Sequence, residues 1–299
     1  MKKKVALLVA AAMLSTTVLA GCGGGSKGTD ESKGSEQGTT TAAGETAGGL
    51  DLAVQIGPDP ETLDPALNSA IDGANMIIHG FETLLTFDEE NNVVPGQAES
   101  FEVSDDGLTY TFHLRDGLKW SDGSDLTAED FVYSYKRLAN PLTAAPYAYD
   151  MLCMVKGYDA ILNLGEDATE EETLAAVDGL AVSAPDAKTF VVELANPCVY
   201  YDKISAFAVL SPVKKDIIEA NGDQCAINPE TYVGNGALRM KEWVPGSYIL
   251  YEKNPYYWDA EKVTVNTVKF VLMEDANASY SAYKTGEIMM AKDIPSEEV

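Results

Sequence analysis

The chain has 299 residues, of which 45% are hydrophobic and 9% aromatic, and it carries a formal net charge of −26. So large an excess of acid repels nucleic acid and anionic lipid headgroups, which argues against either as a partner. The hydrophobic and aromatic content is enough for a folded core. The sequence therefore predicts a globular protein, not a disordered acidic chain.

The first 21 residues have the composition of a secretory signal peptide. Lysines at positions 2–4 precede an apolar stretch at 5–14, and small residues lead from there to Cys22. The apolar stretch is too short to cross a bilayer as a helix, which takes roughly 20 residues. We therefore expect an exported protein.

The junction Leu19-Ala20-Gly21-Cys22 resembles the bacterial lipobox, in which the cysteine becomes the lipidated first residue after cleavage. Residues 23–49 contain no aromatic side chain and no aliphatic one larger than alanine, so this stretch cannot bury enough surface to fold. We predict that Cys22 anchors the protein to the cell membrane and that residues 22–49 form a disordered Gly/Ser/Thr tether. The alternative is an ordinary signal peptide with a chance cysteine.

From Leu50 onward the chain is long enough for two domains or one large α/β unit. Apart from Cys22 it contains Cys153, Cys198 and Cys225, without the spacing of a metal site. At most one disulfide can form among three cysteines. We expect at least one of them to remain a free thiol.

The first part of this region predicts a strand, a helix and a hairpin. Residues 50–56 alternate in polarity before a Gly-Pro-Asp-Pro loop, and residues 75–85 carry apolar side chains at helical spacing. Residues 100–103 and 109–114 flank the turn Asp105-Asp106-Gly107, as in a β-hairpin.

A helix is predicted after Thr127, which can cap it together with Asp130 at the third position. Phe131, Tyr135 and Leu138 repeat along one stripe before Asn140-Pro141 ends the pattern. We expect this helix to pack on the sheet of the hairpin.

The remaining pattern alternates helices and strands, which predicts a mixed α/β fold. The expected elements are a helix at 170–177, strands at 180–183 and 189–194 with a turn at Pro185-Asp186, a helix begun by Ser211-Pro212 and ended by Asn221-Gly222, a hairpin of 238–243 and 248–253, a strand at 268–272, and a helix at 276–284 closed by Gly286. Residues 295–299 have the composition of a helix start, so we expect the sequence to be truncated.

The pattern contains no catalytic, metal or cofactor motif that its context supports. The two histidines, His79 and His113, lie in segments of different type, and neither belongs to a metal-ligand spacing. No glycine-rich nucleotide motif follows a strand. We expect no metal and no cofactor.

One set of residues mimics the serine acyltransferases of the penicillin-binding type. Ser211-Pro212-Val213-Lys214 precedes Lys284-Thr285-Gly286, but no Ser-x-Asn lies between them, and the second motif ends a predicted helix instead of lying on a strand. This enzyme remains an alternative, as does a surface lipoprotein with an adhesive or scaffolding role.

Three stretches together resemble the oligopeptide-binding proteins of ABC importers, extracellular solute-binding protein family 5, which includes peptide, nickel and haem binders. The stretches are Glu61-Thr62-Leu63-Asp64-Pro65, then Phe112 to Asp122-Gly123 with Leu126 to Phe131, and finally Gly234-Asn235-Gly236-Ala237 with Asn254-Pro255-Tyr256-Tyr257-Trp258. The continuation through Asn140-Pro141 to Tyr147 is similar to the oligopeptide branch. Leu238 departs from the pattern, which often has an aromatic residue there.

The resemblance implies a two-lobed clamp of α/β type in which a peptide is held as an added strand. By that analogy residues 50–82 and 206–299 form a first domain, residues 83–205 form a second, and the opposing lobe is missing. It further implies a monomeric binding protein, not an enzyme, which delivers oligopeptides to the permease and ATPase subunits of an ABC importer.

The same resemblance places the ligand at two sites in this chain. The loop Ser69-Ala70-Ile71 is expected to offer main-chain groups to the peptide, and Tyr147 is expected to cover an apolar ligand side chain while its hydroxyl stays hydrogen-bonded. Gly234-Asn235-Gly236 is interpreted as a tight turn that needs positive φ, without a ligand role.

Overall fold

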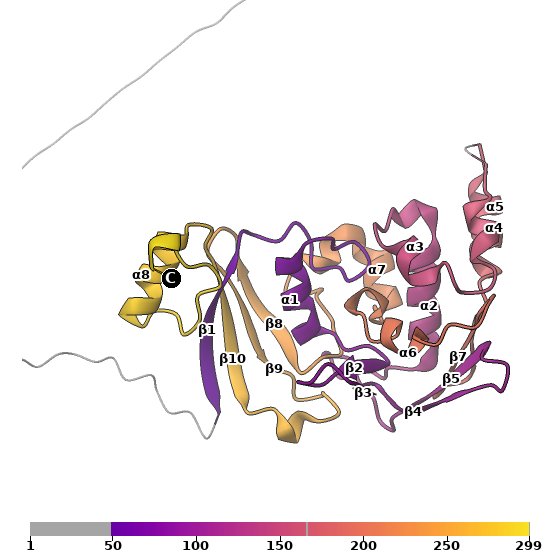
Figure 1. Ribbon diagram of the computed structural model, residues 1–299, viewed down its shortest axis with the longest axis horizontal. Helices are drawn as coiled ribbons and strands as arrows, with labels where there is room; N and C mark the ends of the chain where they lie inside the picture. The colour runs from indigo at the N-terminus through magenta and orange to yellow at the C-terminus, as the bar shows by residue number, and fades with distance from the viewer. Residues whose placement is uncertain (1–48, 166, 299) are drawn as a thin grey trace, which may run out of the picture. The chain divides into compact units, whose positions relative to one another are not determined.

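The computed structural model describes residues 49–165 and 167–298 (Figure 1). The predicted signal peptide, Cys22 and residues 23–48 of the predicted tether lie outside the described residues. None of the described helices is long and apolar enough to cross a membrane.

A four-stranded sheet joins the first strand to the last three. It contains β1 (Leu50–Gly57), β8 (Leu238–Val244), β9 (Tyr248–Lys253) and β10 (Val265–Leu272), in the order β1-β10-β9-β8. β1 runs parallel to β10, whereas β10, β9 and β8 are antiparallel. The predicted hairpin is confirmed, and the predicted strand at 268–272 begins three residues earlier.

A second four-stranded sheet, entirely antiparallel, has the order β4-β5-β7-β6. Its strands are β4 (Ala98–Val103), β5 (Thr109–Leu114), β6 (Val182–Asp186) and β7 (Thr189–Glu193). The predicted hairpin is confirmed, and Gly107 supplies the left-handed φ of +70° that its turn needs. The turn predicted at Pro185-Asp186 is wrong, because both residues belong to β6. A small antiparallel pair, β2 (Leu85–Phe87) and β3 (Val93–Pro95), stands apart from both sheets.

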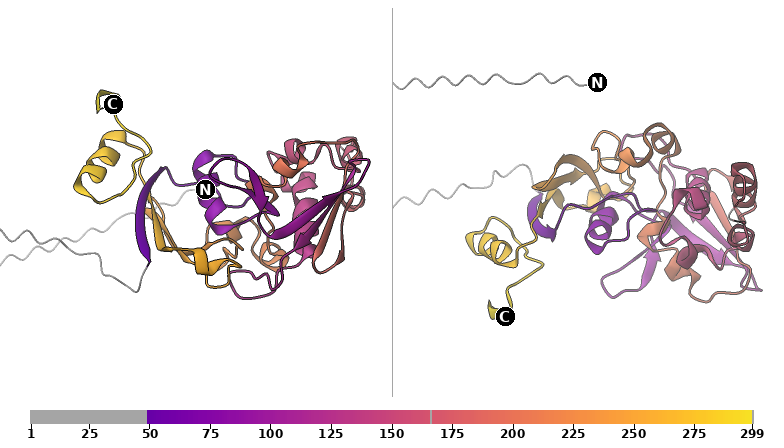
Figure 2. Two further views of the ribbon diagram at one scale, coloured as in Figure 1. Left: turned by 60° about the horizontal axis from the view of Figure 1, so that its bottom comes forward. Right: turned by 90° about the horizontal axis from the view of Figure 1, so that it is seen from above.

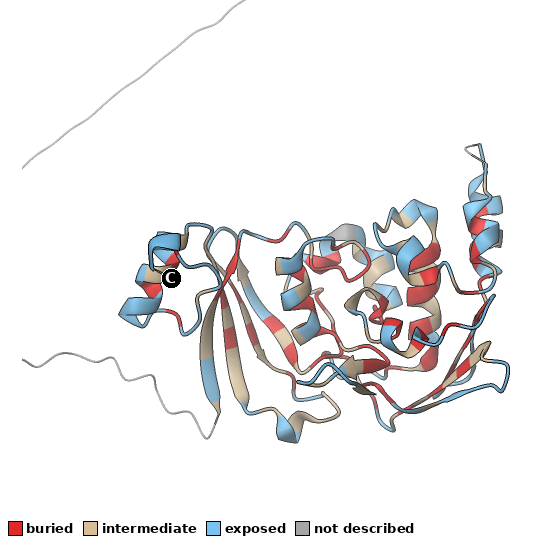
Figure 3. Ribbon diagram, in the orientation of Figure 1, coloured by how far each residue is buried: buried red, intermediate tan, exposed pale blue. Residues whose placement is uncertain are grey.

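Helix α2 (Ala128–Ala139) is capped as predicted, with the Thr127 N–H donating to the Asp130 carboxylate at 2.7 Å. Its apolar stripe is fully buried against the second sheet. The Tyr135 and Phe190 ring centroids lie 5.0 Å apart in an edge-on contact. In Figure 3 buried residues recur along this helix. The expected packing of helix on hairpin sheet is therefore confirmed.

The shorter helices include two further elements that the sequence predicted correctly, α5 (Glu170–Asp178) and α8 (Ala276–Thr285), the latter ended by Gly286 at φ +77°. The other helices are α3 (Ala148–Leu152), α4 (Tyr158–Leu162), α6 (Tyr201–Ile204) and α7 (Lys215–Asn221), and Figure 2 shows their arrangement from two further sides. Residues Ser296–Glu298 form a single 3₁₀ turn.

Two predicted helix boundaries are wrong. Helix α1 (Ile71–Gly80) begins four residues before the predicted start and ends before Phe81, which is extended at φ −130° and ψ 152°. Phe81, Leu84 and Leu85 are buried, so their spacing reflects a buried loop and strand and not a helix face. Helix α7 begins at Lys215, not at Pro212, because the chain is still extended at Lys214 (φ −78°, ψ 114°).

Every strand of the first sheet comes from residues 50–82 or 206–299, and every strand of the other two sheets comes from residues 83–205. This division coincides with the predicted domain limits. Contacts nevertheless hold residues 49–165 and 167–298 together in a single compact unit. The two-domain division therefore remains a prediction.

Candidate functional site

The loop Ser69–Ile71 connects the buried Asp64 turn to helix α1. Ser69 and Ala70 are exposed, and Ile71, the first residue of the helix, is 75% exposed. Ala70 is extended at φ −104° and ψ 142°. This exposed, extended segment is the kind of edge to which another chain can add as a strand.

The main-chain groups of this loop differ in whether they already have partners. The Ala70 N–H donates to Asn68 Oδ1 at 3.4 Å, and the Ala70 C=O accepts from Asn68 Nδ2 at 2.9 Å and from the Ala74 N–H at 3.0 Å. Among the described residues, no protein group bonds the N–H or C=O of Ser69 or the N–H of Ile71. The loop therefore presents two donors and one acceptor.

Beside this loop lies an open pocket of about 280 Å³ with a largely apolar lining. It is formed by the loop, by α1, by the start of α3 and by the 3₁₀ turn η2 (Ala208–Leu210) with the residue before it. Its lining residues are Asn68, Ser69, Ala70, Ile71, Ala74, Ile77, Tyr147, Met151, Phe207, Ala208 and Val209. All four residues predicted to contact ligand thus line one pocket, although their binding role stays a prediction.

Tyr147 lies at the residue before α3 and is 39% exposed, and Phe207 across the pocket is 48% exposed. Exposed aromatic rings beside a hollow offer large contact area with little loss of side-chain freedom. The predicted hydrogen bond of the Tyr147 hydroxyl is not seen within the described part of the chain.

A second hollow, of about 330 Å³, shares Asn68, Ser69 and Ala70 with the first. Its other lining residues include Glu61, Thr62 and Gln224, so it is the more polar of the two. A strand laid along the loop would direct alternate side chains to opposite faces. The loop therefore borders two hollows, one largely apolar and one more polar.

No charged side chain lines the apolar pocket. The nearest ion pair in sequence joins Asp72 to Lys292 and involves the first turn of α1. Another pair, between Asp64 and Arg137, lies under the loop: Arg137 Nη1 and Nη2 lie 3.0 and 2.5 Å from the two Asp64 oxygens, and the Asp64 side chain is 1% exposed. These pairs support the loop and leave the pocket uncharged.

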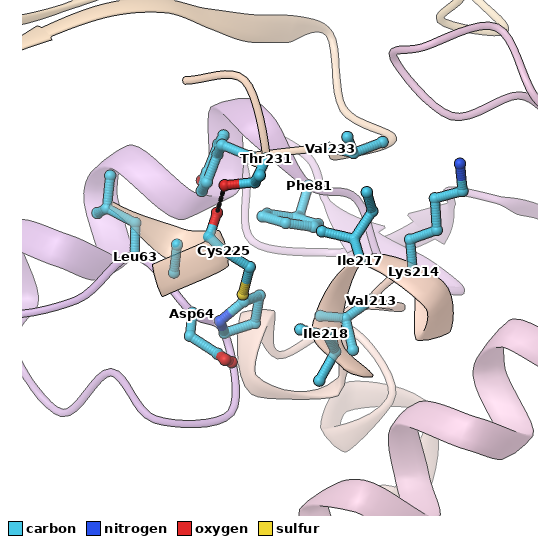
Figure 4. Close-up of a pocket in the computed structure, with 13 residues that line it drawn as sticks. Leu63, Asp64, Phe81, Val213, Lys214, Ile217, Ile218, Cys225, Thr231 and Val233 are labelled. Carbon is cyan, nitrogen blue, oxygen red and sulfur yellow. Dashed lines mark hydrogen bonds between the residues drawn. The ribbon is translucent and has the colours of Figure 1, made fainter. Parts of the chain in front are cut away.

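A small cavity of about 20 Å³ lies behind the Asp64 turn (Figure 4). Its lining includes Leu63, Phe81 and Ile217, and the Thr231 hydroxyl donates to the Cys225 carbonyl at 3.3 Å at its edge. This volume has room for no more than a water or two. It is a packing void and cannot hold a ligand.

The motif residues of the family resemblance meet at Glu82, away from the apolar pocket. Its carboxylate accepts from the Tyr257 hydroxyl at 2.6 Å, from Trp258 Nε1 at 2.7 Å and from Gln97 Nε2 at 2.5 Å. The Arg115 guanidinium stacks 3.6 Å from the Trp258 ring centroid. Burial is the largest effect on the Glu82 carboxyl and raises its pKa above the ordinary value. The three hydrogen bonds and the Arg115 charge act in the opposite direction and only partly offset it. The cluster joins the loop after β9 to the residue before β4 and serves the fold.

The interpretation of Gly234 and Gly236 as residues with positive φ is wrong, because neither has it. The two glycines are needed for close approach instead. A Cβ at Gly234 would lie 1.9 Å from the Gly80 oxygen, and one at Gly236 would lie 2.7 Å from the Gly80 carbonyl carbon. The segment therefore packs its main chain directly on the end of α1.

The structure separates the residues of the acyltransferase motif. Ser211 is buried, and Lys214 pairs with Asp122 at 2.5 Å. Lys284 and Thr285 belong to α8, where Lys284 Nζ lies over the Tyr280 ring at 4.3 Å. The motif requires this segment to lie on a strand beside the serine. The described residues do not assemble that active site.

No group of three or more His, Cys, Asp or Glu side chains within residues 49–165 and 167–298 could hold a metal ion. Cys153 is an exposed thiol and Cys198 a buried one, which confirms that at least one cysteine is free.

Sequence reasoning missed Asn68, Met151 and Phe207 as pocket residues. Of these three, only Asn68 could have been predicted as a pocket residue from the sequence, because it directly precedes the predicted loop.

The fold is that of part of a bacterial solute-binding protein. Residues 92–299 match the family of bacterial extracellular solute-binding proteins, family 5 Middle. The chain therefore belongs to this family, as the motifs predicted.

Similar proteins include the periplasmic oligopeptide-binding protein OppA of Salmonella typhimurium, 37% identical over 81% of this chain and 43% of that protein. The probable deoxycholate-binding periplasmic protein YgiS of Escherichia coli is 36% identical over 80% of this chain and 44% of that protein. The crystal structure of Haemophilus influenzae OppA in complex with RPPGFSPFR matches with a TM-score of 0.73 and 32% identity, covering 83% of this chain and 47% of that one. The chain thus spans about half the length of the relatives it matches, and its α/β fold is that of part of their clamp.

Proposed function

We propose that the chain is the part of an extracytoplasmic solute-binding protein in which the loop Ser69–Ile71 and the apolar pocket beside it hold an oligopeptide. The observation that carries this is the pairing of three unbonded main-chain groups with an exposed apolar hollow. An added peptide strand satisfies the main-chain groups, and its side chains enter the hollows. Because main-chain groups are common to all peptides, such a site accepts many sequences.

The clamp proposed for the whole protein has two lobes. The strand membership of the sheets supports a first domain of residues 50–82 and 206–299 and a second of residues 83–205. The opposing lobe corresponds to the part of the relatives that this chain does not span. A peptide lying on the loop is then covered by that lobe, which supplies the remaining contacts.

The proposed partners are the permease and ATPase subunits of an ABC importer, with Cys22 as the lipid anchor. The support for the anchor is the lipobox resemblance and the composition of the stretch after it, since Cys22 lies outside the described residues. The Cys22→Ala protein is expected in the soluble fraction of cells, and the parent in the membrane fraction. Membrane attachment of the variant would count against lipidation.

A binding role, as opposed to an enzymatic one, is tested by incubating the purified full-length protein with mixed oligopeptides. Intact bound peptides should be recovered by mass spectrometry, and turnover of the peptides would refute the proposal.

Radiolabelled penicillin should not label Ser211, whereas covalent labelling would favour the acyltransferase alternative. A neighbouring coding region without permeases and ATPases would favour a surface lipoprotein of another role.

The contact with the loop is tested by Ile71→Pro in the full-length protein. Ile71 is the first residue of α1, where proline is favoured, and its N–H has no partner to lose. Ala70 already has the extended conformation that a following proline requires. The fold should therefore be kept, while peptide binding loses one hydrogen bond, about 0.5–1.5 kcal/mol by calorimetry.

Two further variants, Tyr147→Ala and Ile71→Ala, extend this test. Tyr147→Ala should weaken binding of peptides with large apolar side chains more than that of polar peptides, and Ile71→Ala is the control for the lost side chain. Unchanged peptide affinity in both Ile71→Pro and Tyr147→Ala would place the cleft on another surface.

A further inference from the structure

Asn68 directly precedes the loop, and its side chain is buried, with 8% exposure. Its carboxamide bonds both main-chain groups of Ala70, at 2.9 Å to the C=O and at 3.4 Å from the N–H. A neighbouring strand would make this same pair of bonds with an extended residue. The Asn68 side chain therefore occupies the side of the loop to which the Ala70 groups point.

Helix α1 is built to admit this side chain. A Cβ at Gly73, in the first turn, would lie 2.1 Å from Asn68 Oδ1 and 3.2 Å from the Thr62 oxygen. Glycine is a poor helix former, so its presence three residues into a helix needs a reason. Space for the Asn68 carboxamide is that reason in this structure.

In an extended chain, the main-chain groups of alternate residues point to the same side. Ala70 is extended, and the C=O of one residue and the N–H of the next point in opposite directions across their planar peptide bond, so the Ser69 C=O and the Ile71 N–H are turned away from Asn68. These two groups and the Ser69 N–H are without partners among the described residues. One buried side chain thus accounts for the two bonded groups of Ala70 and for the direction of the Ser69 C=O and the Ile71 N–H.

We propose that Asn68 is a positioning residue for the peptide, which directs the Ser69 and Ile71 main-chain groups to the ligand strand by bonding those of Ala70. This inference rests on the proposed peptide site. The ligand strand then forms hydrogen bonds to this loop only along one of its two edges. The hydrogen-bonding groups on the ligand's other edge remain available to the rest of the protein. Asn68 itself does not touch the ligand main chain.

The first test is calorimetric peptide affinity of the full-length Asn68→Ala protein. Loss of the bonds to Ala70 should lower affinity about three- to tenfold. Gly73→Ala should produce a similar loss, because its Cβ displaces the Asn68 carboxamide. In the Asn68→Ala background, Gly73→Ala should cause no further loss. Gly165→Ala, whose Cβ would meet nothing within 4 Å, is the control and should bind as the parent does.

The second test separates positioning from general stability. If Asn68 acts through the Ile71 N–H, Asn68→Ala and Ile71→Pro together should cost less affinity than the product of their separate effects. Effects that simply multiply, or a lowered melting temperature with unchanged affinity, would overturn the inference. If Asn68→Ala does not fold, Asn68→Asp is measured instead, because aspartate keeps the side-chain oxygen that accepts from the Ala70 N–H and loses the nitrogen that donates to the Ala70 C=O. Unchanged peptide affinity of Asn68→Asp would also overturn the inference. Unchanged affinity in both Ile71→Pro and Tyr147→Ala instead overturns the proposed site itself.

Discussion

The side chain of Asn235 and the main chain of Glu82 form a reciprocal pair. Asn235 Oδ1 accepts from the Glu82 N–H at 3.0 Å, and its Nδ2 donates to the Glu82 C=O at 2.8 Å. Asn235 is 1% exposed. This pair fixes the segment that leaves α1 against the segment that enters β8, and so joins the first sheet to the residues that lead into the second.

Asn235→Ala should destabilise the protein strongly. It leaves the N–H and C=O of the part-buried Glu82 main chain without these partners, and each such loss costs up to about 1–3 kcal/mol. Denaturant unfolding of the variant should therefore show a loss of several kcal/mol. Asn163, whose exposed side chain donates to the Asp159 carbonyl at 2.8 Å, offers a control, and Asn163→Ala should change stability little. Equal losses in the two variants would contradict the role given to Asn235.

Gly234→Ala should be among the most destabilising single substitutions in the chain. Its Cβ would meet the Gly80 main chain, which cannot move without shifting the end of α1. Overpacking of this kind costs about 1–3 kcal/mol or more. Gly165→Ala has open space at the Cβ, and neither glycine has positive φ, so the two substitutions differ only in space. Melting temperatures that fall equally would refute the close-approach explanation.

The buried ion pair of Asp64 and Arg137 should respond to single substitution far more than an exposed pair does. Arg137→Met leaves the Asp64 carboxylate buried without its cation, a loss of about 3–5 kcal/mol. The exposed pair of Lys188 and Asp116 is the control, and Lys188→Met should have little measurable effect on unfolding. If Arg137→Met unfolds at the same denaturant concentration as the parent, the pair does not stabilise the loop.

The sequence predicted the elements whose local signals agree with their packing. The capped helix after Thr127 and the hairpin around Gly107 are of this kind, because cap, turn and apolar period all point the same way. It failed where burial comes from several sides at once. Phe81 and Leu84 have helical spacing yet lie in a buried loop, and Gly234 is required by the distant Gly80, which no local pattern reveals. The loop at Ser69–Ile71 was predicted from the family resemblance, whereas Phe207 and Met151 reach the pocket only through the tertiary fold.

The carboxyl group of Glu82 should make stability depend on pH in an unusual direction. Burial raises its pKa in the folded protein above the ordinary 4.5, against the hydrogen bonds from Tyr257, Trp258 and Gln97 and the charge of Arg115. A folded state that holds its proton more tightly than the unfolded state is favoured at low pH. The stabilisation is complete below about pH 4.5 and is lost as the pH rises toward the folded pKa.

The measurement is the free energy of unfolding of the parent and of Glu82→Gln from about pH 3 to pH 8. The parent should lose stability relative to Glu82→Gln as the pH rises above 4.5, and the difference should level off above the folded pKa. Glu172 provides a control of opposite sign, because the Thr169 N–H and hydroxyl lower its pKa. Relative to Glu172→Gln, the parent should lose stability as the pH falls through that lowered pKa. A parent that gains stability over Glu82→Gln with rising pH would show that the hydrogen bonds to Glu82 outweigh its burial.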